Sequence, residues 1–186
     1  VFEADCFWLN NQYLVGRALD NRMGGFMIAE VARMLHENAD SLPFTLYLVN
    51  SVQEEIGLRG AEMISRRLQP DVAIITDVTH DTCSPLYNKK QQGDCKCGKG
   101  AVVTYGPAVQ NNLLQMIIGV AKQNEISIQR NAVSRSTGTD TDSFAYSGMG
   151  VASALISLPL KYMHTTVETV HQDDIESCIQ LMYHTV

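Results

Sequence analysis

The chain alternates between short apolar runs and longer segments in which apolar residues recur at helical spacing. The short runs are rich in β-branched and aromatic residues, which is typical of strands in a largely buried sheet. They lie at residues 13–15, 44–50, 72–77, 101–105 and 151–157, and the first of them is short and weak. This alternation of strand-like and helix-like segments predicts an α/β fold.

Four helices are expected around these strands. In the first, at about residues 23–38, Met27, Val31 and Met34 follow one another at spacings of four and three residues. A second should follow Gly60, and a third should cover residues 109–123. The last should begin near Asp173, because acidic residues suit a helix N-terminus. Segment 80–100 is polar and contains glycine, so it predicts a loop.

Composition narrows the functional classes. With 186 residues, 45% hydrophobic and 18% charged, the chain has the composition of one globular domain. A formal net charge of −6 offers no basic surface for a phosphate backbone, which argues against nucleic acid as a partner. No apolar run approaches the roughly 20 residues that cross a bilayer, so no membrane partner is expected. Five cysteines without a disulfide-framework spacing favour a soluble, cytoplasmic protein.

The candidate functional residues occur in four short segments. Each segment has an acidic residue or a histidine at the end of a predicted strand or at the start of a loop. They are LDNR (19–22), QEEIG (53–57), TDVT (76–79) and YMH (162–164). Three of them directly follow predicted strands, and ligands of open α/β sheets gather at the carboxyl ends of strands. One such aspartate alone would most simply be a helix cap or a turn residue. Together, the four segments predict one site.

These residue types suit two divalent cations. Aspartate, glutamate and histidine are ligands for hard or borderline metals, and one carboxylate can bridge two of them. A two-metal hydrolase also needs a free carboxylate beside the metal-bound water, to accept its proton. The pair Glu54 and Glu55 can supply one ligand and one base. Because adjacent strand residues point to opposite faces, both can serve only where strand geometry breaks down, and Ile56-Gly57 is a plausible place for that.

Five segments together resemble the signature blocks of the M42 family of aminopeptidases in their order and spacing. The segments are GRALDNRMGG (16–25), SVQEEIGLRGA (51–61), IITDVTHDT (74–82), TGTDTDSF (137–144) and LPLKYMHTTVET (158–169). The resemblance implies a zinc-exopeptidase-like fold, in which a mixed central β-sheet is flanked by helices. It also implies removal of N-terminal residues from peptide substrates with two divalent metal ions, zinc or cobalt, and a metal-bridging water as nucleophile. Homo-oligomers from dimer to dodecamer are implied for the full-length protein.

The resemblance assigns roles to individual residues. Asp20 would bridge the two metals, Glu55 and His164 would complete one site, and Asp77 would belong to the other. Glu54 would be the general base. Two interpretations of Gly138, Thr139 and Asp140 remain open: a structural turn in which Asp140 hydrogen-bonds the backbone, or a segment whose backbone lines the substrate pocket.

One ligand of the family pattern is missing. The second metal site also takes a histidine from a segment upstream of an inserted dimerisation domain, and both are expected to precede Val1. Residues 1–186 would then be the catalytic domain without its N-terminal segment and without the insert. His80, three residues after Asp77, is another candidate ligand, although a loop position disfavours it.

Two other functions remain open. The first is a non-catalytic subunit that lost a metal ligand but kept the fold. The second is a glycoside hydrolase, which requires two carboxyl groups about 5 to 9 Å apart across a sugar cleft. No aromatic platform for a sugar lies near the acidic segments, since Trp8 is the only tryptophan. Cys95-Lys96-Cys97 lacks the second ligand pair of a zinc site and is interpreted as loop.

Overall fold

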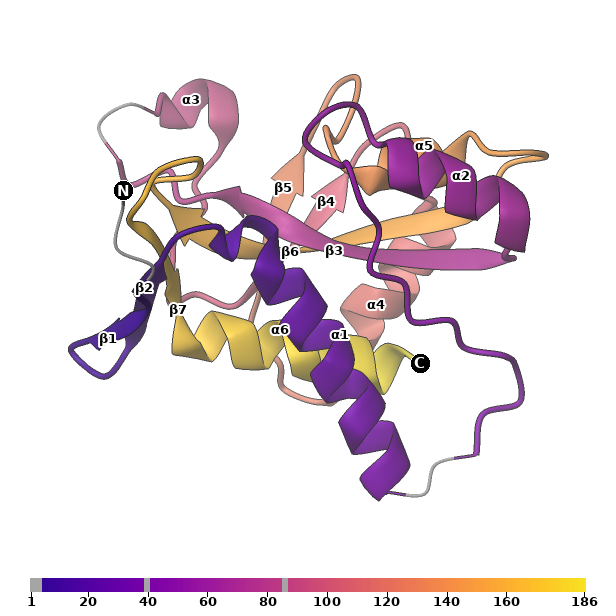
Figure 1. Ribbon diagram of the computed structural model, residues 1–186, viewed down its shortest axis with the longest axis horizontal. Helices are drawn as coiled ribbons and strands as arrows, with labels where there is room; N and C mark the ends of the chain where they lie inside the picture. The colour runs from indigo at the N-terminus through magenta and orange to yellow at the C-terminus, as the bar shows by residue number, and fades with distance from the viewer. Residues whose placement is uncertain (1–4, 39–40, 85–86) are drawn as a thin grey trace.

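The computed structural model describes residues 5–38, 41–84 and 87–186. Its strands are β1 (Phe7–Leu9), β2 (Tyr13–Gly16), β3 (Val72–His80), β4 (Ala101–Tyr105), β5 (Ile128–Ala132), β6 (Ala152–Lys161) and β7 (Glu168–His171). Its helices are α1 (Leu19–Glu37), α2 (Arg59–Leu68), α3 (Lys89–Gln92), α4 (Asn111–Gln123), α5 (Asp140–Ala145) and α6 (Gln172–Thr185). Helices α1, α4 and α6 cover one face of the sheet, and α2 and α5 cover the other (Figure 1).

The sheet is mixed. Its strand order is β1-β2-β7-β6-β4-β5, and β3 pairs with β6 beside this path. Strands β3 and β6 run parallel over their whole shared length, from Val72 opposite Ala152 to His80 opposite Leu160. Strands β4 and β5 are also parallel, whereas the remaining pairs are antiparallel. The α/β class and the mixed, helix-flanked sheet are therefore confirmed.

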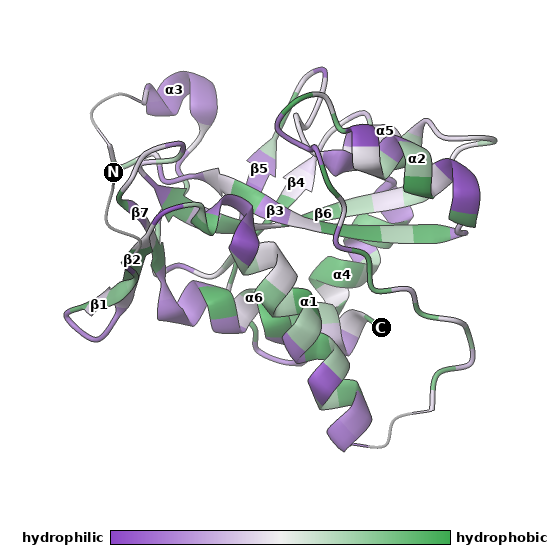
Figure 2. Cartoon of the chain, viewed as in Figure 1, coloured by the Kyte–Doolittle hydropathy of each residue, from purple (hydrophilic) through white to green (hydrophobic). Residues whose placement is uncertain are grey.

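Two apolar cores lie on opposite faces of this sheet. The larger packs the sheet against α1, α4 and α6, and its fully buried side chains include Met27, Leu114, Ile117, Ile156 and Leu181. The smaller lies under α2 and α5 and contains Ala61, Ala73, Ile75, Phe144 and Leu155. Burial on both faces explains why β3 and β6 are nearly continuous apolar runs in the sequence. Figure 2 shows this hydrophobic colouring along β3 and on α4 and α6.

The expected elements agree with the structure in most places. All four predicted helices are present as α1, α2, α4 and α6, and four of the five predicted strands are present as β2, β3, β4 and β6. The prediction that residues 80–100 form a loop is wrong in two places. Strand β3 extends to His80 because β6 continues beside it, and the short helix α3 interrupts the remainder.

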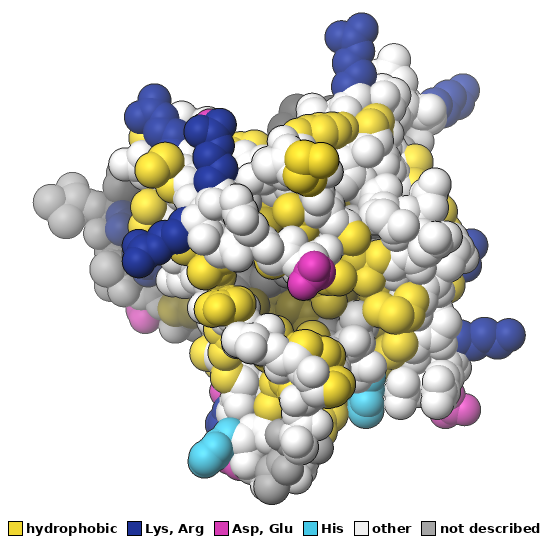
Figure 3. Space-filling view, turned by 90° about the vertical axis from the view of Figure 1, so that its right-hand side faces the viewer, with side chains coloured by type: hydrophobic (Ala, Val, Ile, Leu, Met, Phe, Trp, Pro, Cys, Tyr) yellow, Lys and Arg dark blue, Asp and Glu magenta, His cyan; other side chains and the backbone are white. Residues whose placement is uncertain are grey.

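The predicted strand at 44–50 is also wrong. The segment has no regular secondary structure, and none of the described strands pairs with it. Phe44, Tyr47 and Leu48 each remain about half exposed, at 52%, 58% and 48%. Its sequence can bury apolar side chains in a sheet, but a strand also requires a hydrogen-bonding neighbour. Figure 3 shows hydrophobic side chains around a hollow on the side of the molecule where this segment runs.

None of the helices in the described part of the chain combines the length and the apolar composition needed to cross a membrane.

Candidate metal centre

The start of α1 places Asp20 beside the middle of β3. Asp20 and Asn21 have non-helical backbone angles, so the regular helix begins after them. The side chain of Asn21 accepts a hydrogen bond from the backbone N–H of Gly24 (2.8 Å) and donates one to the carbonyl of Thr76 (3.0 Å). A Cβ on Gly24 would lie 2.6 Å from Asn21 Oδ1, so this capping arrangement requires glycine. Asn21 therefore ties the first turn of α1 to β3.

Glu54 and Glu55 lie in a tight turn before α2. The backbone N–H groups of Gly57 and Leu58 both donate to the carbonyl of Glu54, each at 3.0 Å. The N–H of Gly60 donates to Val52 O at 2.9 Å, and a Cβ on Gly60 would lie only 2.3 Å from that oxygen. Regular strand geometry is absent here, which is the condition under which two adjacent glutamates can face one site.

His164 lies in the turn between β6 and β7. The hydroxyl of Thr165 stabilises this turn by donating to Tyr162 O (2.6 Å) and accepting from Val167 N (3.2 Å). The Nε2 atom of His164 lies 3.1 Å from Asp20 Oδ2 and 3.4 Å from Glu55 Oε2. One ligand atom from each of these three residues lies within 4.8 Å of the other two. Three segments that are distant in the sequence thus meet at one point.

The donor set of Asp20, Glu55 and His164 fits a divalent cation. Ligand atoms about 2.0 to 2.2 Å from a tetrahedral zinc ion are about 3.3 to 3.6 Å apart. The distances from His164 to its two carboxylate neighbours are close to this range. Burial, followed by the negative charge of Glu55, raises the pKa of Asp20 to about 6. A bound cation would offset both effects, because positive charge stabilises the ionised carboxylate.

Asp77 and Glu54 lie near this group but do not belong to it. Asp77 is buried on β3 and accepts a hydrogen bond from the backbone N–H of Val78 at 2.8 Å. Burial raises the pKa of Asp77 to about 7, and the charges of Glu54 and Asp20 contribute. Burial likewise raises the pKa of Glu54 to about 7, followed by the charges of Asp140, Glu55 and Asp20. These side chains therefore form one acidic environment around the three converging residues.

Gly138, Thr139 and Asp140 form the start of α5. The side chain of Thr139 caps the helix by accepting from Thr141 N at 3.3 Å. The backbone N–H groups of Thr137 and Gly138 donate to Asp142, not to Asp140, so the predicted turn exists with a different aspartate. Asp140 instead accepts a hydrogen bond from the Ser51 hydroxyl. Its Oδ1 atom is buried and has no hydrogen-bond partner among the described residues.

The other histidines lie outside the converging group. His80 ends β3, and its Nδ1 lies 2.8 Å from the hydroxyl of Tyr87. Burial and the nearby charge of His164 lower the pKa of His80. His171 caps α6 by accepting from Asp173 N at 3.2 Å, as expected for a residue before a helix. His36 and His184 lie in α1 and α6, as predicted.

Glu168 contacts the site, although no sequence pattern points to it. Its carboxylate accepts backbone hydrogen bonds from both Asp20 and His164. The position lies inside the YMHTTVE segment, but a glutamate that binds backbone groups leaves no recognisable motif.

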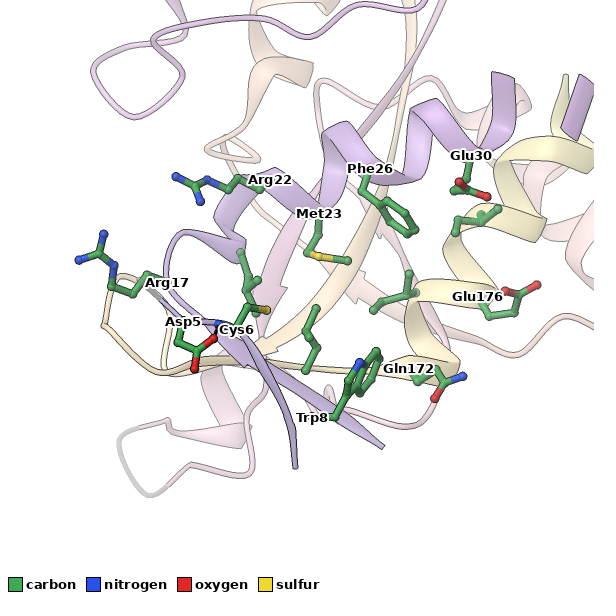
Figure 4. A pocket seen from close by; sticks show the side chains of 14 residues that line it. Asp5, Cys6, Trp8, Arg17, Arg22, Met23, Phe26, Glu30, Gln172 and Glu176 are labelled. Carbon is green, nitrogen blue, oxygen red and sulfur yellow. Dashed lines mark hydrogen bonds between the residues drawn. The ribbon is translucent and has the colours of Figure 1, made fainter. Parts of the chain in front are cut away.

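A separate cavity of about 580 Å³ lies between β1, β2, α1 and α6. Figure 4 shows Trp8, Met23 and Phe26 around it, with Glu30, Glu176 and Gln172 towards α6. None of the candidate metal ligands lines this cavity, and Glu54 does not line it either.

Comparisons with known proteins identify the family of this chain. The sequence profile of the family described as M42 glutamyl aminopeptidase matches residues 1–181. The lysyl aminopeptidase of Pyrococcus furiosus is 39% identical over 163 residues, which are 88% of this chain and 45% of that protein.

Two solved structures extend the similarity to the fold. The TET aminopeptidase from the marine sediment archaeon Thaumarchaeota archaeon SCGC AB-539-E09 has a TM-score of 0.89 and 30% identity over 96% of this chain and 50% of its own. The TET1 peptidase of Pyrococcus horikoshii has a TM-score of 0.77 and 29% identity, covering 99% of this chain and 53% of its own. The chain thus spans about half the length of these relatives. Because the family profile matches nearly the whole sequence, the chain belongs to the M42 family of aminopeptidases.

Proposed function

We propose that this chain carries the metal centre of an aminopeptidase that hydrolyses N-terminal residues from peptides. The observation that carries the proposal is the convergence of Asp20, Glu55 and His164 within 4.8 Å. The M42 family is metal-dependent, and its members similar to this chain include a lysyl aminopeptidase and a glutamyl aminopeptidase.

Within this proposal, Asp20, Glu55 and His164 hold one divalent cation, and Asp20 and Asp77 contribute to a second. Zinc and cobalt both suit carboxylate and imidazole ligands. When bound, the cations polarise the scissile carbonyl and lower the pKa of a water molecule. The position of Asp77, whose pKa responds to the charge of Asp20, supports its inclusion. A further ligand for the second cation would come from outside residues 1–186.

Glu54 is the proposed general base. Its carboxylate accepts the proton of the attacking water and then delivers this proton to the leaving amine. Two features support this role. Glu54 does not belong to the converging group, whereas the adjacent Glu55 does. Glu54 is also partly buried, and burial raises its pKa to about 7, close to neutral pH, which suits a general base.

Gly138, Thr139 and Asp140 are proposed to border the substrate. The charge of Asp140 raises the pKa of both Glu54 and Asp77, which supports a position of its carboxylate near the proposed reaction centre. Its buried Oδ1 atom has no partner among the described residues and can accept a hydrogen bond from a ligand. Peptide N-termini carry a positively charged ammonium group, which can donate a hydrogen bond to this carboxylate oxygen.

Residues 1–186 are proposed to be part of a catalytic domain whose complete protein forms a homo-oligomer. The relatives are about twice as long as this chain, and TET1 of Pyrococcus horikoshii assembles into a tetrahedron or a large octahedral shell.

The two alternatives predict different behaviour. A non-catalytic subunit would neither cleave peptides nor require metal, and a glycoside hydrolase would cleave polysaccharides. One experiment separates the three: the complete gene product is stripped with a chelator, supplied with Zn²⁺ or Co²⁺, and incubated with a peptide, its N-acetylated form, and a soluble β-glucan. We expect metal-dependent release of the first residue from the free peptide only. Hydrolysis of the β-glucan alone, or no hydrolysis with either metal, would reject the proposal.

A further inference from the structure

Glu168 is the first residue of β7 and is almost completely buried, with 2% of its surface exposed. Its Oε2 atom accepts a hydrogen bond from the backbone N–H of Asp20 at 3.0 Å. Its Oε1 atom accepts one from the backbone N–H of His164 at 2.7 Å. One carboxylate thus holds the main chains of two residues whose own side chains meet 3.1 Å apart.

These hydrogen bonds should be strong. The acceptor is an ionisable carboxylate, which forms shorter and stronger hydrogen bonds than a neutral oxygen does. Burial strengthens them further, because little water competes for the donors. The distance of 2.7 Å to His164 N lies at the short end of the usual range for N–H···O contacts.

The segment that carries His164 needs such an external contact. The φ angle of His164 is +60°, and that of Tyr162 is also +60°. Residues other than glycine adopt this left-handed conformation at an energetic cost, so surrounding contacts must hold it in place. The side chain of His164 is 64% exposed, so side-chain packing contributes little to its position. The bond from its backbone N–H to Glu168 supplies a fixed point next to the imidazole.

We propose that Glu168 is a positioning residue that pre-forms the divalent cation site by fixing Asp20 relative to His164. The inference rests on the proposed function, because it presupposes that these side chains bind a cation. Without Glu168, the turn after β6 and the start of α1 could move independently, and the cation would have to order both on binding. Outer contacts of this kind typically contribute 10- to 100-fold to metal affinity.

Glu168 is not proposed as a ligand. Both of its oxygens are directed at backbone donors, and it is absent from the group of converging ligand atoms. A lost ligand and a lost positioning contact have different consequences. Loss of a ligand should reduce the number of zinc ions bound at saturation, whereas loss of a positioning contact should weaken affinity without changing that number.

The test is a Zn²⁺ titration of the complete gene product against a chromophoric chelator at pH 7.5, for wild type and Glu168→Gln. Glutamine keeps the size of the side chain, but its NH₂ group must face one of the two backbone N–H donors. We expect the dissociation constant to rise by about 10- to 100-fold with unchanged stoichiometry. Glu176→Gln on the exposed face of α6 is the matched control and should bind as wild type does.

Thermal unfolding of the metal-free proteins separates positioning from general stability. If Glu168→Gln lowers the melting temperature but binds Zn²⁺ within twofold of wild type, Glu168 is merely structural and the inference is wrong. Loss of one bound equivalent at saturation would identify it as a ligand and also overturn the inference.

If the glutamine variant does not fold, Glu168→Asp keeps the charge but is too short to reach both donors. Weaker zinc binding that recovers at high zinc then supports the inference, and unchanged affinity rejects it. Absence of zinc binding by the wild type would instead reject the proposed cation site itself.

Discussion

The imidazole of His164 lies 3.1 Å from the carboxylate of Asp20, although one residue follows β6 and the other opens α1. The two backbones are linked through Glu168, and Glu55 approaches the same imidazole from the turn before α2. The position of the imidazole therefore depends on three separate segments.

The adjacent glutamates should differ when each is replaced by glutamine in the complete gene product. Glu54→Gln removes the proton acceptor but no proposed ligand, so metal content should be unchanged while kcat falls by about 10² to 10⁴. Glu55→Gln should weaken zinc binding and regain part of its activity in excess zinc or cobalt. The measurements are metal analysis of the purified variants and steady-state kinetics on a peptide.

The reverse pattern would show that the roles of the two glutamates are exchanged. Activity near the wild-type level in both variants would remove the proposed mechanism and favour the non-catalytic subunit.

Gly60→Ala should disturb the turn that carries both glutamates. The added Cβ would lie 2.3 Å from Val52 O, so the backbone must shift, at about 1 to 3 kcal/mol of stability. We expect weaker zinc binding as well, because Glu55 lies in the displaced turn. Gly119→Ala is the control: Gly119 lies in α4, no atom stands within 4 Å of its added Cβ, and alanine should stabilise the helix by about 0.5 to 1 kcal/mol. Equal zinc affinity in Gly60→Ala and wild type would contradict this view of the turn.

The pH dependence of stability should reveal the buried carboxylate of Asp174. Burial raises the pKa of Asp174 from 3.8 to about 6, although the N–H groups of Gly98 and Gly100 partly oppose this. Between these values the folded state keeps a proton that the unfolded state has lost. The resulting stability is fully present below pH 3.8 and is lost as pH rises through about 6.

Asp174→Asn cannot titrate. From pH 4 to 7, the free energy of unfolding of the wild type should fall relative to this variant by on the order of 2 to 3 kcal/mol. Urea unfolding across this range measures the difference, and Asp173→Asn, at an exposed position on the same turn, serves as the control. A difference between wild type and Asp174→Asn that does not change with pH would refute the prediction.

The parts of the fold that the sequence predicts correctly are those with strong burial patterns. Strands β3, β4 and β6 are apolar on both faces, and α4 has a clear apolar face, so each is recognisable locally. Strand β5 (IQRNA) is polar and partly exposed at the edge of the sheet, where it pairs only with β4 among the described strands. Strands β1 and β7 and helix α5 are too short to establish a period.

Segment 44–50 shows the limit of pattern-based prediction. FTLYLVN has the composition of a buried strand, but composition does not specify whether a neighbouring strand is present. The candidate site also contains residues that sequence patterns can identify and one that they cannot. Four short segments at predicted strand ends or loop starts contain Asp20, the pair Glu54-Glu55, Asp77 and His164, whose carboxylate and imidazole groups are recognisable as possible ligands. The resemblance to the M42 family then assigns a role to each residue. Glu168 acts on backbone N–H groups, and which backbone groups it meets depends on the tertiary structure.

The most direct measurement is a crystal structure of the zinc-soaked protein with an anomalous difference map at the zinc edge. The proposed metal centre predicts a peak bounded by Asp20 Oδ2, Glu55 Oε2 and His164 Nε2, with each atom about 2.0 to 2.2 Å from the ion. It predicts a second, adjacent peak next to Asp77 if the remaining ligand is present. A well-ordered structure in which zinc is bound elsewhere, or in which these three side chains are apart with no ion between them, would contradict it.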